Sequence, residues 1–359
     1  MNIITVVMLV FSMLGALDRI LGCRFGLGKE FERGFHLLGI MALSMIGMIV
    51  ISPWIADVLA PVFDLVWNTL HIDPSIIPAS LFANDMGGAP LSVEVAKDPA
   101  VGMFNALVVS SMMGCTISFT IPFALGVIEE HLHKSVLLGF LCGIVTIPVG
   151  CLIGGLTLGL PIGALVGDLL PLLLFSGLIA LGLVLCPMQC VKIFGIIGKG
   201  IKILITIGLA LAILRYLSGI ELLPGLATLE EGAMVCLNAS AVMSGAFPLM
   251  FVLSKLLQKP LAYLGKKIGI NEISALGFVS SMATSVTTYG MMKDMDERGV
   301  VYNAAFTISG AFTFAGHLAF TMAFDSDYIL PMIVGKLTAG FTSVLVAVLV
   351  CRRQEKKTV

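Results

Sequence analysis

Long apolar segments separated by short polar ones make up most of the chain. The segments that approach the length an α-helix needs to cross a bilayer are residues 2–17, 34–56, 101–126, 135–157, 162–187, 203–218, 232–254, 299–322 and 328–350. The short alternating strands that mark a membrane barrel are not part of this pattern. We therefore predict an all-α polytopic membrane protein with about nine transmembrane helices.

Two further segments, residues 74–98 and 272–296, are moderately apolar but have polar centres. The first contains the run NDMGGAP at 84–90, and the second contains the hydroxyl-rich run SSMATSVTTY at 280–289. Polar interruptions at membrane depth are typical of re-entrant hairpins or broken helices that line a cavity. We predict two re-entrant broken hairpins here.

The positions of the basic residues favour hairpins over crossings. If both interrupted segments turn back and the N-terminus lies outside, every Lys and Arg except Lys97, Arg215 and Lys336 falls on the cytoplasmic side. A crossing by residues 74–98 would instead move the lysines of residues 188–202 outside, against the positive-inside rule. The two hairpins then enter from opposite faces, and residues 351–359 form a basic cytoplasmic tail.

The two halves of the chain share a layout. At a constant offset of 198 residues Asp98 matches Asp296 and Asn105 matches Asn303. Each half contains two spans, a hairpin and two further spans, in opposite orientation. We predict two inverted-topology repeats, residues 1–158 and 200–350, connected by a linking span within 159–199; such repeats are common in secondary transporters.

Composition excludes several classes of protein. Hydrophobic residues make up 58% of the chain and charged residues 12%, and the mean hydropathy is +1.05. A cytosolic enzyme, a nucleic-acid-binding protein and a disordered scaffold are all incompatible with these values. The eight cysteines lack metal-ligand spacing, and the chain has no Walker loop, HExxH motif or GxSxG motif. We predict no enzymatic activity, no cofactor and no metal site.

Asp85 is the leading candidate for a binding residue. It lies beside Asn84 at the predicted tip of the first hairpin, where only a polar cavity keeps a carboxylate ionised. A carboxylate in such a cavity suits an ammonium group or a coupling cation. Alternatively, or in addition, Asp85 caps the N-terminus of the following half-helix.

Hydroxyl groups dominate the second hairpin. Ser281, Thr284 and Tyr289 are candidates for contacts to a small alcohol, and the tyrosine ring also suits a cation. The alternative for the serines and threonines is a hydrogen bond back to a helix carbonyl, which is common in membrane helices.

Three more ionisable residues lie within predicted spans. Asp168 and Lys336 have similar depths from the outer end of their spans, which predicts a structural ion pair over a substrate role. His317 titrates in the physiological range when unperturbed and is a candidate proton relay.

Several stretches resemble the ethanolamine permease of the bacterial ethanolamine-utilisation operon, the EutH family. They include FERGFHLLGIMALSMIGM at 31–48, NDMGG at 84–88, SMMGCTISFTIPFALGVIE at 111–129, GIVTIPVGC at 143–151, YGMMKDMDERG at 289–299 and ILPMIVGKL at 329–337. The resemblance spans nearly the entire chain. It implies a multi-pass protein of the bacterial cytoplasmic (inner) membrane that takes up ethanolamine for cytoplasmic enzymes to deaminate, with no cofactor.

The residues themselves leave alternatives open. A sodium- or proton-coupled secondary transporter of another small solute, such as an amino acid or a nucleoside, fits the same layout. Facilitated diffusion and ion-coupled symport both remain compatible with the sequence, as do a monomer and a homo-oligomer. The predicted partners are ethanolamine and the lipid bilayer, with no nucleic acid.

Overall fold

The structure, a computed structural model, describes residues 3–358 apart from the side chains of residues 261, 264 and 354–358. Within that part of the chain every regular element is a helix. Eight helical stretches are long and apolar enough to cross a membrane: Ile3–Ile20, Leu27–Leu70, Pro99–Val127, Glu130–Thr157, Ile162–Leu185, Pro187–Ser218, Leu229–Pro260 and Ser326–Arg353. The predicted all-α polytopic architecture is therefore confirmed.

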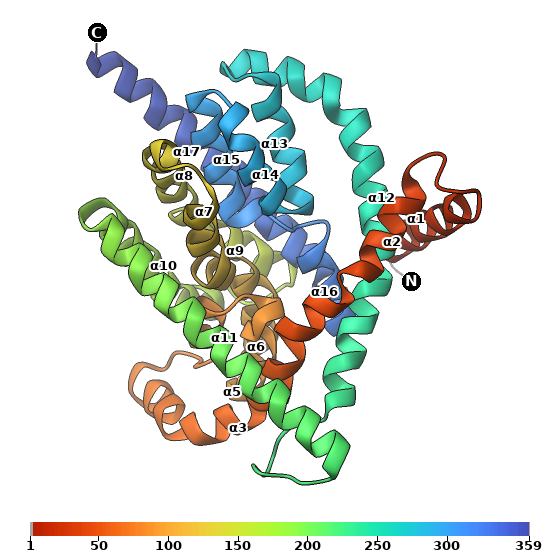
Figure 1. Cartoon of the computed structure of the whole chain (residues 1–359). Coiled ribbons are helices and arrows are strands. Elements are labelled where there is room, and N and C mark those ends of the chain that lie inside the picture. The colour runs from red at the N-terminus through yellow and green to blue at the C-terminus, as the bar shows by residue number, and fades with distance from the viewer. Residues whose placement is uncertain (1–2, 359) are drawn as a thin grey trace.

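Long helices surround a centre built from short ones. Figure 1 shows α11 (Pro187–Ser218) as a long tilted helix that crosses the front of the molecule from the left to the lower right, and α12 (Leu229–Ile268) along the right side. The other long elements are α1 (Ile3–Ile20), α2 (Leu27–His36), α3 (Leu38–Leu70), α8 (His133–Ile144), α9 (Ile147–Thr157), α10 (Ile162–Leu185) and α17 (Ile329–Thr358). Leucines of α10 at 170, 173, 174, 178 and 181 are exposed, as expected of a surface that faces lipid.

Glycines set the closest helix crossings. Lipid is as apolar as leucine, so helices in a membrane associate through close packing of small residues. At the crossing of α3 and α11, a Cβ added at Gly208 would collide with the carbonyl oxygen of Gly47. A Cβ at Gly150 of α9 would likewise collide with the carbonyl oxygen of Gly335 in α17.

Both interrupted segments fold into pairs of short helices. Hairpin one consists of α4 (Ile76–Leu81), the 3₁₀ turn η1 (Asn84–Met86) and α5 (Gly88–Val95). Hairpin two consists of α13 (Glu272–Ala283) and α14 (Ser285–Met291), which is followed by the 3₁₀ turn η5 (Met292–Asp294). In each case the two helices pack against one another, so the polar runs coincide with turns between half-helices.

Hydrogen bonds tie the two ends of each hairpin together. The carboxylate of Asp73 accepts from the backbone N–H groups of Lys97 and Asp98, at 3.0 and 2.9 Å. In hairpin two the N–H of Asn271 donates to the carboxylate of Asp296 at 2.8 Å. Each segment therefore starts and ends at the same place in the fold.

The closing residues occupy matched positions in the two halves. Asp73 and Asn271 are separated by the same 198 residues as Asp98 and Asp296. Asp98 and Asp296 also have the same role, since each caps the helix that follows its hairpin, α6 (Pro99–Phe104) or α15 (Glu297–Gly310). This agreement supports the two-repeat organisation, which stays a prediction.

The predicted span 299–322 is not a continuous helix. It consists of α15 and α16 (Gly316–Phe324), separated by an unwound segment at 311–315 in which Phe312 has a φ of 61°. The N–H groups of Phe312 and Phe314 donate to the carbonyl oxygens of Ser281 and Met282 at 3.0 and 2.9 Å. Hairpin two thus satisfies the backbone groups that the break would otherwise leave unpaired.

Residues 99–127, which match the broken span at the offset of 198 residues, form a continuous helix that is π-helical in its middle. It begins with α6, passes through the π-helical stretches η2 (Asn105–Gly114) and η3 (Thr116–Thr120), and ends with α7 (Ile121–Val127). The unwound residues 311–315 correspond at the same offset to residues 113–117 of the π-helical region, so both halves depart from regular α-helix next to their hairpins. Departures of this kind often occur at functional sites.

The crossing of α3 and α11 gives the first prediction. Gly208→Ala should lower stability in detergent by about 1–3 kcal/mol, because a new methyl group must push the two backbones apart. Gly177→Ala in α10 is the matched control, since a Cβ there meets nothing within 4 Å. Thermal unfolding of the purified variants measures both, and equal melting temperatures for all three proteins would contradict this account of the crossing.

Candidate functional site

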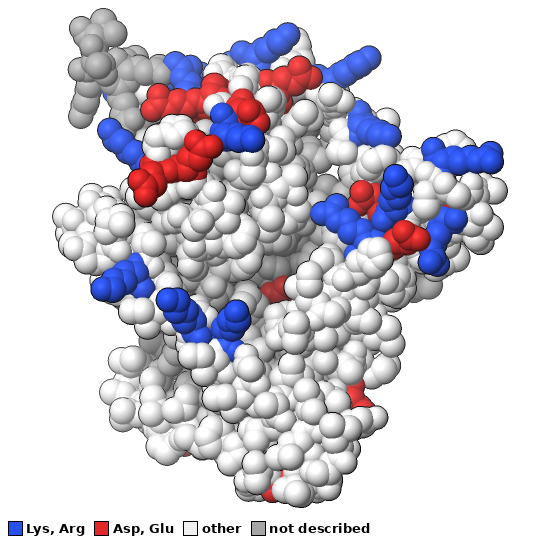
Figure 2. Space-filling view, viewed as in Figure 1, with Lys and Arg blue, Asp and Glu red and all other residues white. Residues whose placement is uncertain are grey.

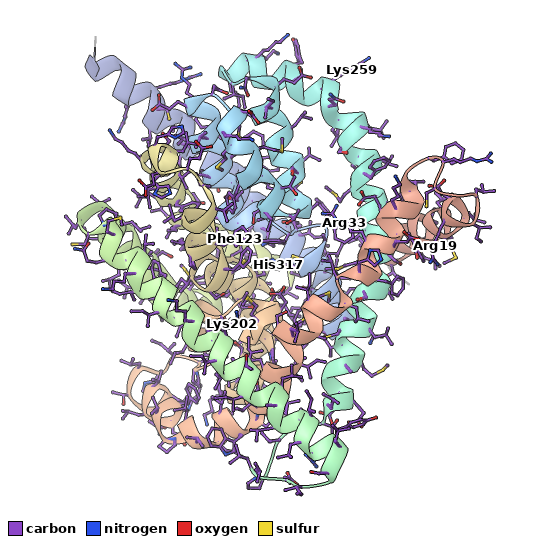
Figure 3. The ribbon with its side chains drawn as sticks, in the orientation of Figure 1. Arg19, Arg33, Phe123, Lys202, Lys259 and His317 are labelled. Carbon is purple, nitrogen blue, oxygen red and sulfur yellow. The ribbon has the colours of Figure 1, made fainter. Side chains whose placement is uncertain are left out.

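Three irregular elements meet around one cavity near the middle of the fold. Its volume is about 220 Å³. It is lined by the tip of hairpin one, the π-helical span, the unwound segment and the start of α3, through Ile40, Ser44, Ala83, Asp85, Met86, Cys115, Phe119, Phe312 and His317. Figure 3 shows His317 at the middle of the molecule in this view. We refer to this space as the central cavity.

Glycines allow hairpin one to reach the cavity. Gly87 has a φ of 105°, a left-handed conformation that favours glycine, and an added Cβ would also collide with the Met48 side chain. Gly114 of the π-helix packs directly on the carbonyl oxygen of Phe82, where no side chain fits. The GG of the NDMGG run is therefore explained by the turn at Gly87 and by the close approach of Gly88 to the carbonyl oxygen of Phe82.

The predicted pair Asn84 and Asp85 does lie at this tip. Asp85 lines the central cavity, and among the described residues Lys336 is the cation that acts on its carboxylate. Asn84 is fully buried, and neither its amide nitrogen nor its amide oxygen has a hydrogen-bond partner in the described part of the chain. A buried amide of this kind is expected to meet another polar group.

The predicted ion pair of Asp168 and Lys336 is wrong. Asp168 accepts a hydrogen bond from Nδ2 of Asn105 at 3.0 Å, and Lys336 donates to the carbonyl oxygen of Ser111 at 2.7 Å. Among the ion pairs of the described residues none joins the two. Depth along a span does not specify which neighbour a side chain faces, and Lys336 is bonded to the π-helical span instead.

The hydroxyl candidates of hairpin two are not in the central cavity. Ser281 is buried and donates to the carbonyl oxygen of Phe278 at 2.8 Å, which is the back-bonded alternative. Thr284 caps α14 through the N–H of Val286. Tyr289 is buried in the apolar core beside Phe123, with 6.3 Å between the ring centroids. The structure therefore does not bring these three side chains to Asp85.

Thr284 instead lines a second space on the basic side of the molecule. This hollow has a volume of about 350 Å³ and lies between hairpin two, α12 and α2. Its lining includes Glu30, Arg33, Lys255, Gln258, Ser280, Thr284 and Thr287. Figure 2 shows Lys and Arg over the upper and middle parts of this face and none at its lower end, and a hollow with acidic atoms visible inside it.

Phe312 connects the central cavity to hairpin two. Its side chain lines the central cavity, while its backbone is bonded to Ser281 in the hairpin that lines the basic hollow. Its ring packs edge-on against Phe119, with 5.6 Å between centroids, and lies 5.3 Å from the His317 ring. Sequence reasoning missed this residue because the unwound run AFTFA contains neither proline nor glycine.

The proton relay and a metal site are the two remaining candidates for function. His317 lines the central cavity, but its Nδ1 has no hydrogen-bond partner among the described residues, so the relay role stays a prediction. Within the described residues no group of three or more His, Cys, Asp or Glu could hold a metal ion.

Comparison with known proteins gives one consistent result. The profile of the family described as "Ethanolamine utilisation protein, EutH" matches residues 1–350. A Listeria monocytogenes protein named "Probable ethanolamine permease EutH" is 44% identical, over 99% of this chain and 95% of its own. A Salmonella typhimurium protein of the same name is 38% identical over 99% of this chain and 96% of its own. The "Uncharacterized protein YxeR" of Bacillus subtilis is 38% identical over 98% of this chain and 95% of its own. No solved structure matches.

The hydrogen bond between Asn105 and Asp168 gives the second prediction. Asn105→Leu should destabilise the protein by about 3 kcal/mol, because it leaves a buried carboxylate without its donor. Asp168→Asn should have a smaller effect, since an amide oxygen still accepts the bond. Thermal unfolding of Asn105→Leu, Asp168→Leu and the double variant checks the coupling. Losses that simply add in the double variant would show that the two side chains do not depend on one another.

Proposed function

The chain belongs to the EutH family of ethanolamine utilisation proteins, and from this premise we propose that it is a permease for ethanolamine. It takes up the ammonium form across the inner membrane into the bacterial cytoplasm, and it transports its substrate without altering it. The observation that carries this proposal is a carboxylate, Asp85, in a small central cavity at the tip of a broken hairpin.

The chemistry of ethanolamine suits this cavity. A simple amine titrates close to the lysine value of about 10.4, so ethanolamine near neutral pH is mostly a cation. Its ammonium group needs an anion, which Asp85 supplies, and the faces of Phe119 and Phe312 add favourable contacts for a cation. Low polarity around the site strengthens each of these interactions.

The small size of ethanolamine limits its affinity. Even the best small ligands gain about 1.5 kcal/mol per non-hydrogen atom, so four such atoms give at most about 6 kcal/mol, or a Kd of roughly 40 μM. A charge-assisted hydrogen bond of about 1.5–3 kcal/mol is a large share of that total. Asp85 is therefore expected to dominate binding.

The alcohol end needs a different partner from the one that the sequence indicated. His317 lines the same cavity as Asp85, and its Nδ1 is free of other hydrogen bonds within the described residues. The imidazole can donate to or accept from a hydroxyl group. We assign the alcohol contact to His317 in place of Ser281, whose hydroxyl is occupied by the carbonyl of Phe278.

The two spaces suggest a route through the protein. Substrate held at Asp85 passes Phe312 and reaches the basic hollow, where Ser280, Thr284 and Thr287 provide hydroxyl groups. Movement of hairpin two would carry the unwound segment with it, because Phe312 and Phe314 are hydrogen-bonded to that hairpin. Many secondary transporters bind their substrate at broken helices between two repeats and achieve alternating access by moving one repeat against the other around that site.

The third prediction tests the binding site. Asp85→Asn should weaken ethanolamine binding roughly ten- to a hundred-fold, because it removes a charge-assisted contact. It should weaken ethylamine binding equally, since the alcohol group is not involved. Asp327→Asn, at an exposed position, is the matched control. Half-saturation of uptake by reconstituted protein measures the effect, and unchanged transport by a well-expressed Asp85→Asn protein would exclude the aspartate from the binding site.

The fourth prediction tests the barrier at Phe312. Phe312→Gly removes the ring and suits the positive φ, so the backbone should remain in place while the central cavity opens toward the basic hollow. Cys115, which lines the cavity and is buried, serves as the reporter in a protein whose other cysteines are replaced. An impermeant maleimide applied from the cytoplasmic side should label it severalfold faster in the variant. Equal labelling rates would place the barrier elsewhere.

A further inference from the structure

Lys336 is a charged residue that the binding site described above does not use. It lies in α17, its side chain is 1% exposed, and Nζ donates to the carbonyl oxygen of Ser111 at 2.7 Å. An ammonium group buried at this depth in a membrane protein is expensive unless an opposite charge compensates it. The role of Lys336 therefore depends on where the compensating negative charge lies.

The groups around Lys336 include one carboxylate. Asp85 is the carboxylate that acts on the lysine electrostatically, and Lys336 in turn acts on His317. Asp85 and Lys336 do not form an ion pair within 4.0 Å among the described residues. The two charged groups are therefore more than 4.0 Å apart, and Lys336 is not among the residues that line the central cavity.

The path of the π-helix explains the gap. Ser111, which holds the lysine, comes four residues before Cys115, and both are buried in the same span. Cys115 lines the central cavity on which Asp85 also lies. The Lys336 ammonium is thus bonded to the span whose Cys115 lines the central cavity, and among the described residues it neither lines that cavity nor forms an ion pair with Asp85.

Resting on the proposed function, we propose that Lys336 is the fixed counter-cation of Asp85, which makes the empty carrier neutral and the ethanolamine-loaded carrier singly positive. Because the charges of Asp85 and Lys336 cancel, the empty carrier can reorient without moving an isolated charge through the membrane. The same lysine repels the bound ammonium, which keeps affinity modest and release fast. Because the loaded carrier moves one positive charge inward, an inside-negative membrane potential drives accumulation without a coupling ion.

The test compares two modes of transport in proteoliposomes. Lys336→Gln retains a donor for the Ser111 carbonyl but removes the charge, so the empty carrier then holds an uncompensated carboxylate. Net uptake into ethanolamine-free vesicles should fall about tenfold or more, because it requires the empty carrier to return. Counterflow into ethanolamine-loaded vesicles should be retained within about twofold, with a lower half-saturation because the repulsion is gone. Lys202→Gln, an exposed lysine of α11, is the matched control.

Stability supplies a second readout that does not depend on transport. Lys336→Gln should lower the melting temperature, and adding Asp85→Asn should recover it, because the second change removes the unpaired charge. Lys336→Arg retains the charge and should keep both transport modes. Equal losses of net uptake and counterflow in Lys336→Gln, unchanged values of both, or no recovery in the double variant would each overturn the proposal. Failure of the unmodified protein to transport ethanolamine would instead contradict the proposed function.

Discussion

The absence of water from the membrane interior is the constraint on which this structure depends. Backbone groups and charges there need partners from within the protein, because hydrocarbon offers none. The fold meets this requirement at each irregular point. Hairpin two supplies carbonyl oxygens to the unwound segment between α15 and α16, and Asp73 and Asp296 close the two hairpins at their ends. Within the described residues some buried polar groups have no such partner, and the amide of Asn84 at the tip of hairpin one is one of them.

The same constraint explains the arrangement of buried charge. Asp85 lines the central cavity and Lys336 is bonded to Ser111 outside its lining, while Asp168 is held by Asn105 in a separate cluster at the base of hairpin one. The first arrangement leaves a carboxylate accessible to a small cation, and the second fastens a linking helix to the hairpin. A buried aspartate thus serves binding at position 85 and packing at position 168, because the fold supplies a different partner at each position.

Much of this architecture could be predicted from the sequence, because the relevant signals are local. Apolar length identified the long helices, and the glycines and polar residues of NDMGG and of residues 280–289 marked the turns of both hairpins. The break at 311–315 could not be predicted this way. Its sequence is apolar, and its backbone is held open by hydrogen bonds to Ser281 and Met282, which are distant in the chain. The partner of Lys336 was missed for a related reason, since depth gives no information about the direction in which a side chain points.

We propose that the protein is a carrier for a single organic cation and that its binding site is neutral when empty. Uptake of radiolabelled ethanolamine into proteoliposomes, with membrane potential, sodium gradient and proton gradient set independently, tests this most directly. An inside-negative potential alone should produce accumulation, and either ion gradient alone should produce none. Accumulation that follows a sodium or proton gradient and ignores the membrane potential would contradict it.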